Sequence, residues 1–129
     1  MAKLKEFTVW MENKPGTLSA LAEALGKAKV NILAFMSDEA EGRSRVRLLA
    51  DKPAKAKKTI AALNLQLSEE DVVGVRLANK PGTLAEAAGK LGSAGININH
   101  GYSGAKEGSR RQLVVLAVSN LKQALKVLR

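Results

Sequence analysis

The chain contains no cysteine, few aromatic residues, few acidic residues relative to basic ones, and no long apolar run. Without cysteine there can be no disulfide framework and no thiolate chemistry, and this composition favours the cytoplasm over secretion. The first residues show no signal-type apolar stretch, and no run reaches the length of a membrane span. We therefore expect a soluble cytoplasmic protein that does not contact a membrane.

Basic residues outnumber acidic ones, 21 to 12, which gives a formal net charge of +9. Such a charge can indicate nucleic-acid binding. Base stacking requires aromatic side chains, however, and the chain offers only Phe7, Trp10, Phe35 and Tyr102, scattered along its length. We therefore do not expect a nucleic-acid partner, and an RNA-binding module remains an alternative that the charge permits.

One hexapeptide, Asn-Lys-Pro-Gly-Thr-Leu, occurs twice, at residues 13–18 and again 66 residues later at 79–84. At this offset about half of positions 9–37 are identical to positions 75–103, with no gap. A repeat of this quality indicates a duplicated unit. We expect a first module over residues 1–69 and a second over 70–129, each small enough to need a neighbouring surface.

Each copy of the hexapeptide is predicted to join a strand to a helix. Proline fixes φ and glycine permits a tight turn, so the helix is expected to begin at the threonine. Thr17 and Thr83 are the predicted N-caps, and Glu86 would complete a capping box in the second copy. Backbone N–H groups at such a helix start attract a carboxylate or a phosphate.

The first copy is predicted to follow the order βαββαβ. Its helices are expected over 17–28 and after Asp51, which would cap the second helix with Pro53 in its first turn. Its predicted strands, with a polar hairpin at 38–42, cover residues 5–11, 30–37, 43–50 and 65–67. Glu69, Glu70 and Asp71 would form a solvated linker to the second copy.

The second copy repeats this order but stops early. Its predicted strands cover residues 72–78, 96–102 and 112–118, and its helices lie over 83–94 and after a cap at Ser119 or Asn120. The chain then ends, so this copy is expected to lack a fourth strand. The predicted fold class is α+β, with two ferredoxin-like βαββαβ modules in tandem and antiparallel sheets that carry their helices on one face.

The third strands of the two copies differ in character. Arg43, Arg45 and Arg47 share one face in the first copy, whereas residues 113–118 are apolar on both faces. A continuous apolar run indicates a strand that is covered on both sides, and a missing fourth strand would leave an unpaired edge. We predict that Leu113, Val115 and Ala117 are buried against another module, in this chain or in a second copy, and that the chain forms a two-fold dimer.

The strand, the hexapeptide, an amphipathic helix and then Val-Asn-Ile or Ile-Asn-Ile together resemble the ACT domain, twice and over nearly the whole chain. The resemblance implies a stand-alone tandem ACT protein: a non-enzymatic regulatory protein that binds a small amino acid at module interfaces. In serine-sensing members of that family, two Asn residues hold the ligand, and the matching positions here are Asn13, Asn31, Asn79 and Asn97. Met11 and Leu77 stand where those members carry a histidine, so one polar contact to serine is missing.

The expected ligand-binding residues lie in the two turns and in the two Asn-Ile segments. They are Asn13, Gly16, Thr17, Leu18, Asn31, Asn79, Gly82, Thr83, Leu84 and Asn97. An Asn side chain offers both a donor and an acceptor to a free amino acid, or it can bond its own turn backbone. His100 has no catalytic or metal-ligating residue at a telling spacing, so we expect no catalytic site, no metal and no cofactor. A subunit of a larger enzyme without its own ligand is the second alternative.

Lys29 offers a test of the repeat at the level of the backbone. It ends the first predicted helix where the second copy has Gly95. Helices commonly end in a left-handed residue, which is usually glycine. We therefore predict a left-handed backbone at Lys29.

Overall fold

A computed structural model describes residues 1–129. In chain order its elements are β1 (Ala2–Glu12), α1 (Thr17–Lys27), β2 (Ile32–Ala40), β3 (Arg43–Ala50), α2 (Pro53–Ala62), β4 (Gln66–Ala78), α3 (Thr83–Ser93), β5 (Ile98–Gly104), β6 (Arg111–Val118) and α4 (Leu121–Val127). The strands are ordered β2-β3-β1-β4-β6-β5 in one sheet. The predicted α+β class and tandem ferredoxin-like order are confirmed.

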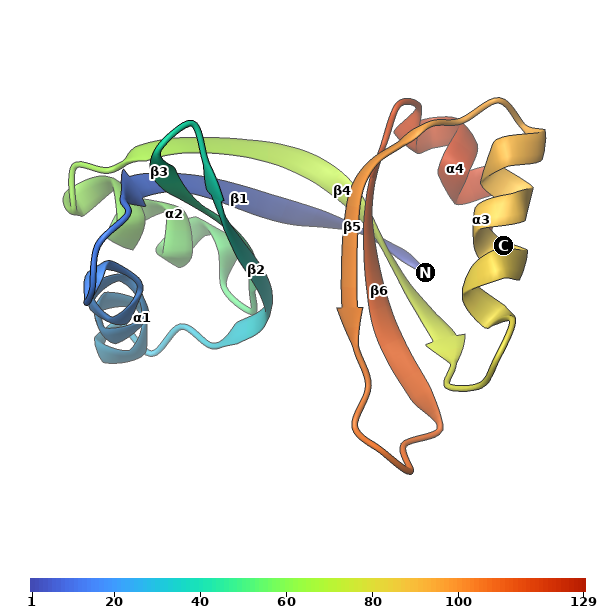
Figure 1. The fold of residues 1–129 in the computed structure, drawn as a ribbon, viewed down its shortest axis with the longest axis horizontal. Helices are drawn as coiled ribbons and strands as arrows, with labels where there is room; N and C mark the ends of the chain where they lie inside the picture. Colours follow the sequence, from blue (N-terminus) through green and yellow to red (C-terminus); the bar gives the residue numbers. More distant parts are fainter. The chain divides into compact units, whose positions relative to one another are not determined.

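The chain divides into two compact units. The N-terminal unit is Lys5–Glu70, and the C-terminal unit combines Met1–Leu4 with Asp71–Arg129. Within each unit two helices cover one face of the strands, α1 and α2 in the first and α3 and α4 in the second (Figure 1). This division differs from the expected modules, 1–69 and 70–129, because the first four residues belong with the later part of the chain.

The start of β1 supplies the strand that the C-terminal unit was expected to lack. Met1–Leu4 belongs to that unit, and β1 is the neighbour of β4 in the sheet. A Cβ added to Gly74 of β4 would collide with the Leu4 side chain, so the glycine leaves the space that Leu4 fills. The expectation of an unpaired edge was wrong, because the N-terminus of the same chain occupies the place.

One continuous strand, β4, replaces the two short strands and the linker predicted between the copies. Glu69, Glu70 and Asp71 lie within this strand, so the prediction of a linker was wrong. Glu69 pairs instead with Lys57 of α2, at 3.1 Å. The neighbouring strand β1 is also longer than predicted, and pairing of two long strands satisfies backbone groups that a linker would leave to water.

Each unit has its own core on the helix-covered face. The N-terminal core contains the large, fully buried side chains of Phe7, Leu21, Leu25, Leu48 and Ile60. The C-terminal core is built from smaller side chains around a single fully buried leucine: Val73, Val75, Leu91, Ile96, Val114, Leu116 and Ala124. The second core therefore depends more heavily on Leu91.

The two helices that follow the hexapeptides, α1 and α3, are confirmed within one residue of their predicted ends. Both end in a left-handed residue, Lys29 with φ 63° and Gly95 with φ 72°, which confirms the prediction for Lys29. The polar hairpin is shorter than predicted, because β2 continues to Ala40. None of the four helices is long and apolar enough to cross a membrane.

The apolar third strand of the C-terminal unit is largely buried within the single chain. Val115 and Ala117 are 1% and 0% exposed, and Leu113 is half-buried. Burial of these residues therefore gives no reason to invoke a second copy of the chain. The predicted dimer has lost both observations on which it rested, and it stays a prediction.

Candidate functional site

The two hexapeptides form the same turn at the start of α1 and α3. Gly16 and Gly82 are the N-cap residues, with φ of 91° and 92° in the left-handed region that favours glycine. Thr17 and Thr83 are therefore the first residues of the helices rather than their caps, and the predicted N-caps were wrong. The left-handed glycine turns the chain one residue earlier than the sequence pattern indicated.

The threonine side chains bond back to the turn instead of capping the helix. Thr17 Oγ1 donates to the Lys14 carbonyl at 3.1 Å, and Thr83 Oγ1 donates to the Ala78 carbonyl at 2.8 Å. No side chain caps either helix, so the predicted capping box with Glu86 is not formed. The N–H of Thr17 bonds the Lys14 carbonyl at 3.4 Å and that of Thr83 bonds the Lys80 carbonyl at 3.5 Å. The next N–H groups of both helices have no side-chain cap and are left available to an anion.

The asparagines that open the two turns have different surroundings. Asn79 donates from Nδ2 to the Ser109 carbonyl at 3.0 Å, and its backbone N–H bonds the Arg110 carbonyl at 2.8 Å. These bonds tie the turn to the loop between β5 and β6. Asn13 is exposed and its side chain makes no hydrogen bond within the chain. Of the two predicted ligand contacts, Asn13 is the one whose amide remains unengaged.

The asparagines that precede β2 and β5 are held through their backbone. The N–H of Asn31 donates to Asp51 Oδ1, and the N–H of Asn97 donates to Ser119 Oγ, both at 2.9 Å. Asp51 therefore anchors Asn31 and does not cap α2, whose N-cap is Lys52, so that prediction was wrong. Both asparagines are exposed.

The side chain of Asn97 is also engaged, since Nδ2 donates to Asn99 Oδ1 at 2.9 Å. The side chain of Asn31, by contrast, makes no hydrogen bond within the chain. Of the four predicted asparagines, the two in the N-terminal unit, Asn13 and Asn31, have unengaged side chains, and the two in the C-terminal unit do not.

A groove lies beside each turn, on the side of the helices, and we call these the turn grooves. Each has a volume of about 290 Å³. The first is lined by Met11, Glu12, Lys14, Thr17, Ala20, Leu21, Leu63 and Leu65, and the second by Val75, Arg76, Leu77, Ala78, Lys80, Thr83, Glu86, Ala87, Lys90 and Leu128. Met11 and Leu77 fill equivalent positions in them, as do Thr17 and Thr83.

A second depression lies on the other side of each helix, against the outer strand, and we call these the edge pockets. Leu18 lines the first, of about 120 Å³, and Leu84 lines the second, of about 370 Å³. The difference follows from one position of the repeat, where Phe35 of β2 corresponds to Gly101 of β5. The edge pocket of the C-terminal unit therefore has more room for an apolar group.

Charge also differs between the two turns. In the N-terminal unit Lys14 Nζ lies 2.8 Å from Glu12 Oε2. The hydrogen bond and the opposite charge together lower the pKa of Glu12 and raise the pKa of Lys14. The second copy has Ala78 in place of Glu12, so Lys80 has no such partner. The turn of the C-terminal unit is therefore the more positive of the two.

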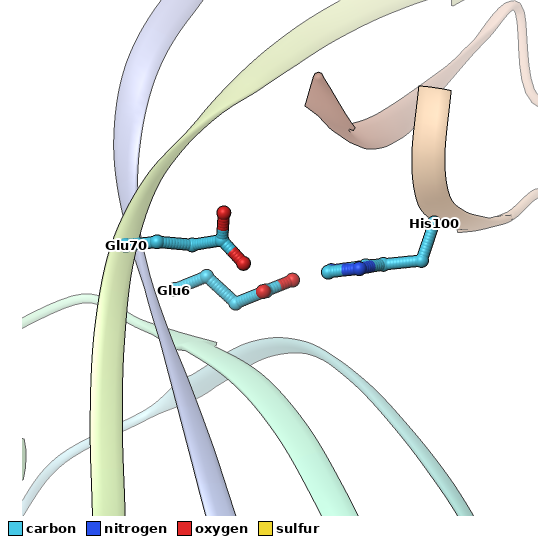
Figure 2. Close-up of side chains that lie close together, drawn as sticks. All are labelled: Glu6, Glu70 and His100. Atoms are coloured by element: carbon cyan, nitrogen blue, oxygen red, sulfur yellow. The ribbon is translucent and has the colours of Figure 1, made fainter. Parts of the chain in front are cut away.

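Two glutamates of the N-terminal unit lie together away from the turns. Glu6 of β1 and Glu70 of β4 extend in the same direction, with their carboxyl oxygens within 4.8 Å of each other (Figure 2). Glu6 is the one polar or charged residue among the fully buried side chains. Sequence reasoning missed it, and the only signal was an acidic residue beside Phe7 in an apolar strand. His100, drawn in the same figure, lies on β5 of the C-terminal unit.

The predicted site residues thus separate into three groups within each unit. Thr17 and Thr83 line the turn grooves, and Leu18 and Leu84 line the edge pockets. The two glycines and the four asparagines line neither depression. Arg76, Lys80 and Lys90 of the second turn groove were not predicted, since they lie on β4, in the turn and on α3, which only the fold brings together.

The sequence matches one family model, described as "ACT domain pair", over residues 2–128. No curated protein matches the sequence. Among solved structures, the protein BT0572 from Bacteroides thetaiotaomicron is 31% identical, with a TM-score of 0.90, and the match covers 98% of this chain and 86% of that one.

Two further structures share the fold at 14% identity. The regulatory subunit of aspartate kinase from Thermus thermophilus, in its ligand-free form, has a TM-score of 0.71, and the match covers 99% of this chain and 91% of that one. A structure of aspartokinase alpha and beta subunits has a TM-score of 0.68, with coverage of 96% and 88%.

Proposed function

Because the chain belongs to the family of ACT domain pairs, we propose that it is a non-enzymatic regulatory protein that binds a small free amino acid. The observation that carries this proposal is the repeated turn, which leaves the uncapped start of a helix next to an asparagine in both units. The aspartate kinase regulatory subunits that share the fold suggest a separate enzyme as the protein that it regulates. The proposed location is the cytoplasm, as the sequence predicts.

The chemistry of a free amino acid fits the groups at the turn. Its carboxylate can accept hydrogen bonds from the N–H groups at the start of α1 or α3, where the helix dipole also favours negative charge. Its ammonium group can donate to the side-chain oxygen of an asparagine. An apolar ligand side chain would find its place in an edge pocket, beside Leu18 or Leu84.

The two units are not equivalent in this proposal. The N-terminal turn offers Asn13 with an unengaged amide, and this is the residue that we expect to contact a ligand at that turn directly. Asn31, whose amide is also unengaged, lies at the other end of α1. The C-terminal turn offers a more positive groove and a larger edge pocket, but Asn79 and Asn97 already make hydrogen bonds. We therefore expect tighter binding of a small amino acid at the N-terminal turn.

Binding would regulate by changing how the chain associates with a partner, either a second copy in a two-fold dimer or the regulated enzyme. An effector shifts such an equilibrium only by its difference in affinity for the two states, which is usually about 1–3 kcal/mol. The ligand therefore needs only modest contacts with the partner to act as a signal.

Thermal-shift screening of the full chain against the twenty amino acids tests the proposal. A ligand at 100 times its Kd stabilises the folded state by about 2.7 kcal/mol, so a true ligand should raise the Tm by several degrees. Asn13→Ala should reduce this rise, whereas Lys55→Ala, on the exposed surface of α2, should preserve it. If no amino acid raises the Tm at millimolar concentration, the alternative of a subunit without its own ligand replaces this proposal.

A further inference from the structure

The sheet of the N-terminal unit has a helix-free face on which arginines gather. Arg45 and Arg47 alternate along β3 with the core residues Val46 and Leu48, so they point away from the helices. Cross-strand register defines the rest of this face: Trp10 and Asp38 lie opposite Arg45, and Thr8 and Met36 lie opposite Arg47. With Arg43, these residues form what we call the arginine face.

Two of the three arginines have acceptors in the chain. Arg45 forms a two-pronged pair with Asp38, through Nε to Oδ1 at 3.0 Å and Nη2 to Oδ2 at 2.7 Å. Arg43 donates to Gln66 Oε1 at 2.8 Å and lies 3.9 Å from the Glu41 carboxylate. Both guanidinium groups also lie over the Trp10 ring, that of Arg43 at 4.4 Å from the ring centroid and that of Arg45 at 5.6 Å.

Arg47 has no acceptor. Its guanidinium makes no hydrogen bond or ion pair in the chain, and its Nε is buried without a partner. Of the carboxylates on this side of the sheet, Asp38 already gives both oxygens to Arg45. Glu6, which lies on the same face of β1 as Thr8, is fully buried and makes no hydrogen bond or ion pair with Arg47. A buried donor without an acceptor costs about 1–3 kcal/mol. Arg47 as a whole is only half-buried, so part of its side chain remains exposed to solution.

We propose that the arginine face is an anion-binding site in which Arg47 holds the carboxylate or phosphate group of a small molecule. The planar guanidinium fork matches both groups, and the hydrogen bonds would be charge-assisted. Arg43 and Arg45 place two further guanidinium groups on the same face, paired with Glu41 and Asp38. Trp10 supplies an aromatic surface on the same face.

The site is a feature of one unit only. The residue equivalent to Arg47 in the C-terminal unit is Val115, which is 1% exposed, and the equivalent of Arg45 is Leu113. Each chain should therefore bind one anion. The site is also separate from the amino-acid site proposed above, because Arg47 lies opposite Thr8, on the other face of the sheet from α1.

The test is a titration of the full chain with sodium phosphate and, separately, with sodium malonate, at constant ionic strength maintained with sodium chloride. The arginine Nε–H signals in ¹H–¹⁵N NMR spectra report on Arg47 directly. Fluorescence gives a second readout, because Trp10 is the only tryptophan. We expect one Nε–H signal, absent from the Arg47→Gln spectrum, to shift saturably with at least one of the two anions.

Arg47→Gln should weaken binding by about tenfold or more, since it removes a charge-assisted donor. Arg111→Gln is the matched control, because Arg111 is exposed and occupies the position equivalent to Arg43 in the other unit; it should leave binding unchanged. Arg47→Lys retains the positive charge but loses the planar guanidinium group, and it replaces Arg47→Gln in the test if the glutamine variant fails to fold. It should also bind more weakly than the wild type.

The response to each anion identifies the ligand group. Saturation by phosphate alone assigns a phosphate ligand, and saturation by malonate alone assigns a carboxylate ligand. No saturable response to either anion, or equal affinity in the wild type and the Arg47 variants, would overturn the proposal. Binding of a single-stranded oligonucleotide without a response to phosphate or malonate would also overturn it and assign the face to nucleic acid.

Discussion

Strands β3 and β6 occupy equivalent positions in the two units, and their side chains are similar on only one of the two sides. The sides that face the helices match closely, since Val46 and Leu48 correspond to Val114 and Leu116. On the opposite side, Arg45 and Arg47 are half-buried, whereas Leu113 and Val115 are apolar and Val115 is fully buried. Packing against helices fixes the fold of both units, and the helix-free side is where each unit has become different.

The two units also differ at one position of their first strands, where the N-terminal segment of the chain is involved. Gly74 of β4 corresponds to Thr8 of β1 in the repeat. The N-terminal unit accepts a side chain there, but in the C-terminal unit the Leu4 side chain occupies the space. The C-terminal unit is thus completed by residues that its own repeat does not contain.

The largest expected effect comes from truncating the equivalent core leucines. Leu25→Ala and Leu91→Ala each remove a fully buried side chain and should lower the free energy of unfolding by about 2–5 kcal/mol. The loss should be the greater for Leu91→Ala, because the C-terminal core has no other fully buried leucine. Urea denaturation measures the total, and hydrogen exchange assigns it to residues 5–70 or 71–129. Greater loss of protection in the N-terminal unit after Leu91→Ala would contradict the division into two cores.

Gly74→Val should have the next largest effect. The added side chain must displace the end of the Leu4 side chain, which is only half-buried and can turn aside, so we expect a cost of about 1–2 kcal/mol, the lower part of the range for overpacking. The second substitution Leu4→Ala should recover part of the loss, and Thr8→Val at the equivalent position should change stability little. Urea midpoints of the three variants decide the matter. If Leu4→Ala makes Gly74→Val worse, Leu4 does not occupy the space beside Gly74.

Exchanging Lys29 and Gly95, which follow α1 and α3, should change the Tm in opposite directions and by less than the substitutions above. Lys29 has φ 63°, a conformation that costs a side-chain-bearing residue about 1 kcal/mol. Lys29→Gly should therefore raise the Tm, and Gly95→Lys should lower it by a similar amount. The backbone carbonyl of Lys29 still accepts from Lys52 Nζ in the glycine variant. A fall in Tm for Lys29→Gly would show that the lysine side chain stabilises the unit in another way.

The smallest expected effect is a pH dependence that only the N-terminal unit should show. Asp38 pairs with Arg45, whereas the equivalent pair in the C-terminal unit is Gly104 and Leu113. The Arg45 hydrogen bond lowers the pKa of Asp38, so the pair stabilises above the ordinary carboxyl pKa and the contribution is lost as the pH falls through the lowered value.

Because Asp38 is about one-third exposed, screening limits this contribution to about 0.5 kcal/mol. Asp38→Asn should lower stability by that amount at neutral pH and by nothing in strong acid. Urea midpoints at the two pH values provide the measurement. An equal loss at both pH values would assign the effect to packing rather than to charge.

The elements that local pattern determines were predictable from the sequence. The repeated hexapeptide, the apolar stripe of α1 and the glycine at position 95 each depend on neighbours within a few residues, and the helices and the left-handed Lys29 followed from them. The N-cap was misassigned because Thr is the usual capping residue, whereas the turn here is made by the left-handed Gly16.

Features that depend on distant parts of the chain were not predictable. Nothing near Asn79 indicates that its amide bonds the loop at Ser109, thirty positions later. In the same way, the sequence around residue 74 does not show that Leu4 completes its unit. The two turns were therefore predictable as local structure, but the difference between them required the structure.

Calorimetry with the amino acid that gives the largest thermal shift tests the central claim most directly. For the wild type we predict saturable binding, and for Asn13→Ala a loss of about 1.5–3 kcal/mol of affinity, because an unengaged amide that contacts the ligand is removed. Lys55→Ala should bind as the wild type does. If Asn13→Ala and Asn79→Ala both bind the amino acid with wild-type affinity, the ligand does not bind at the repeated turns.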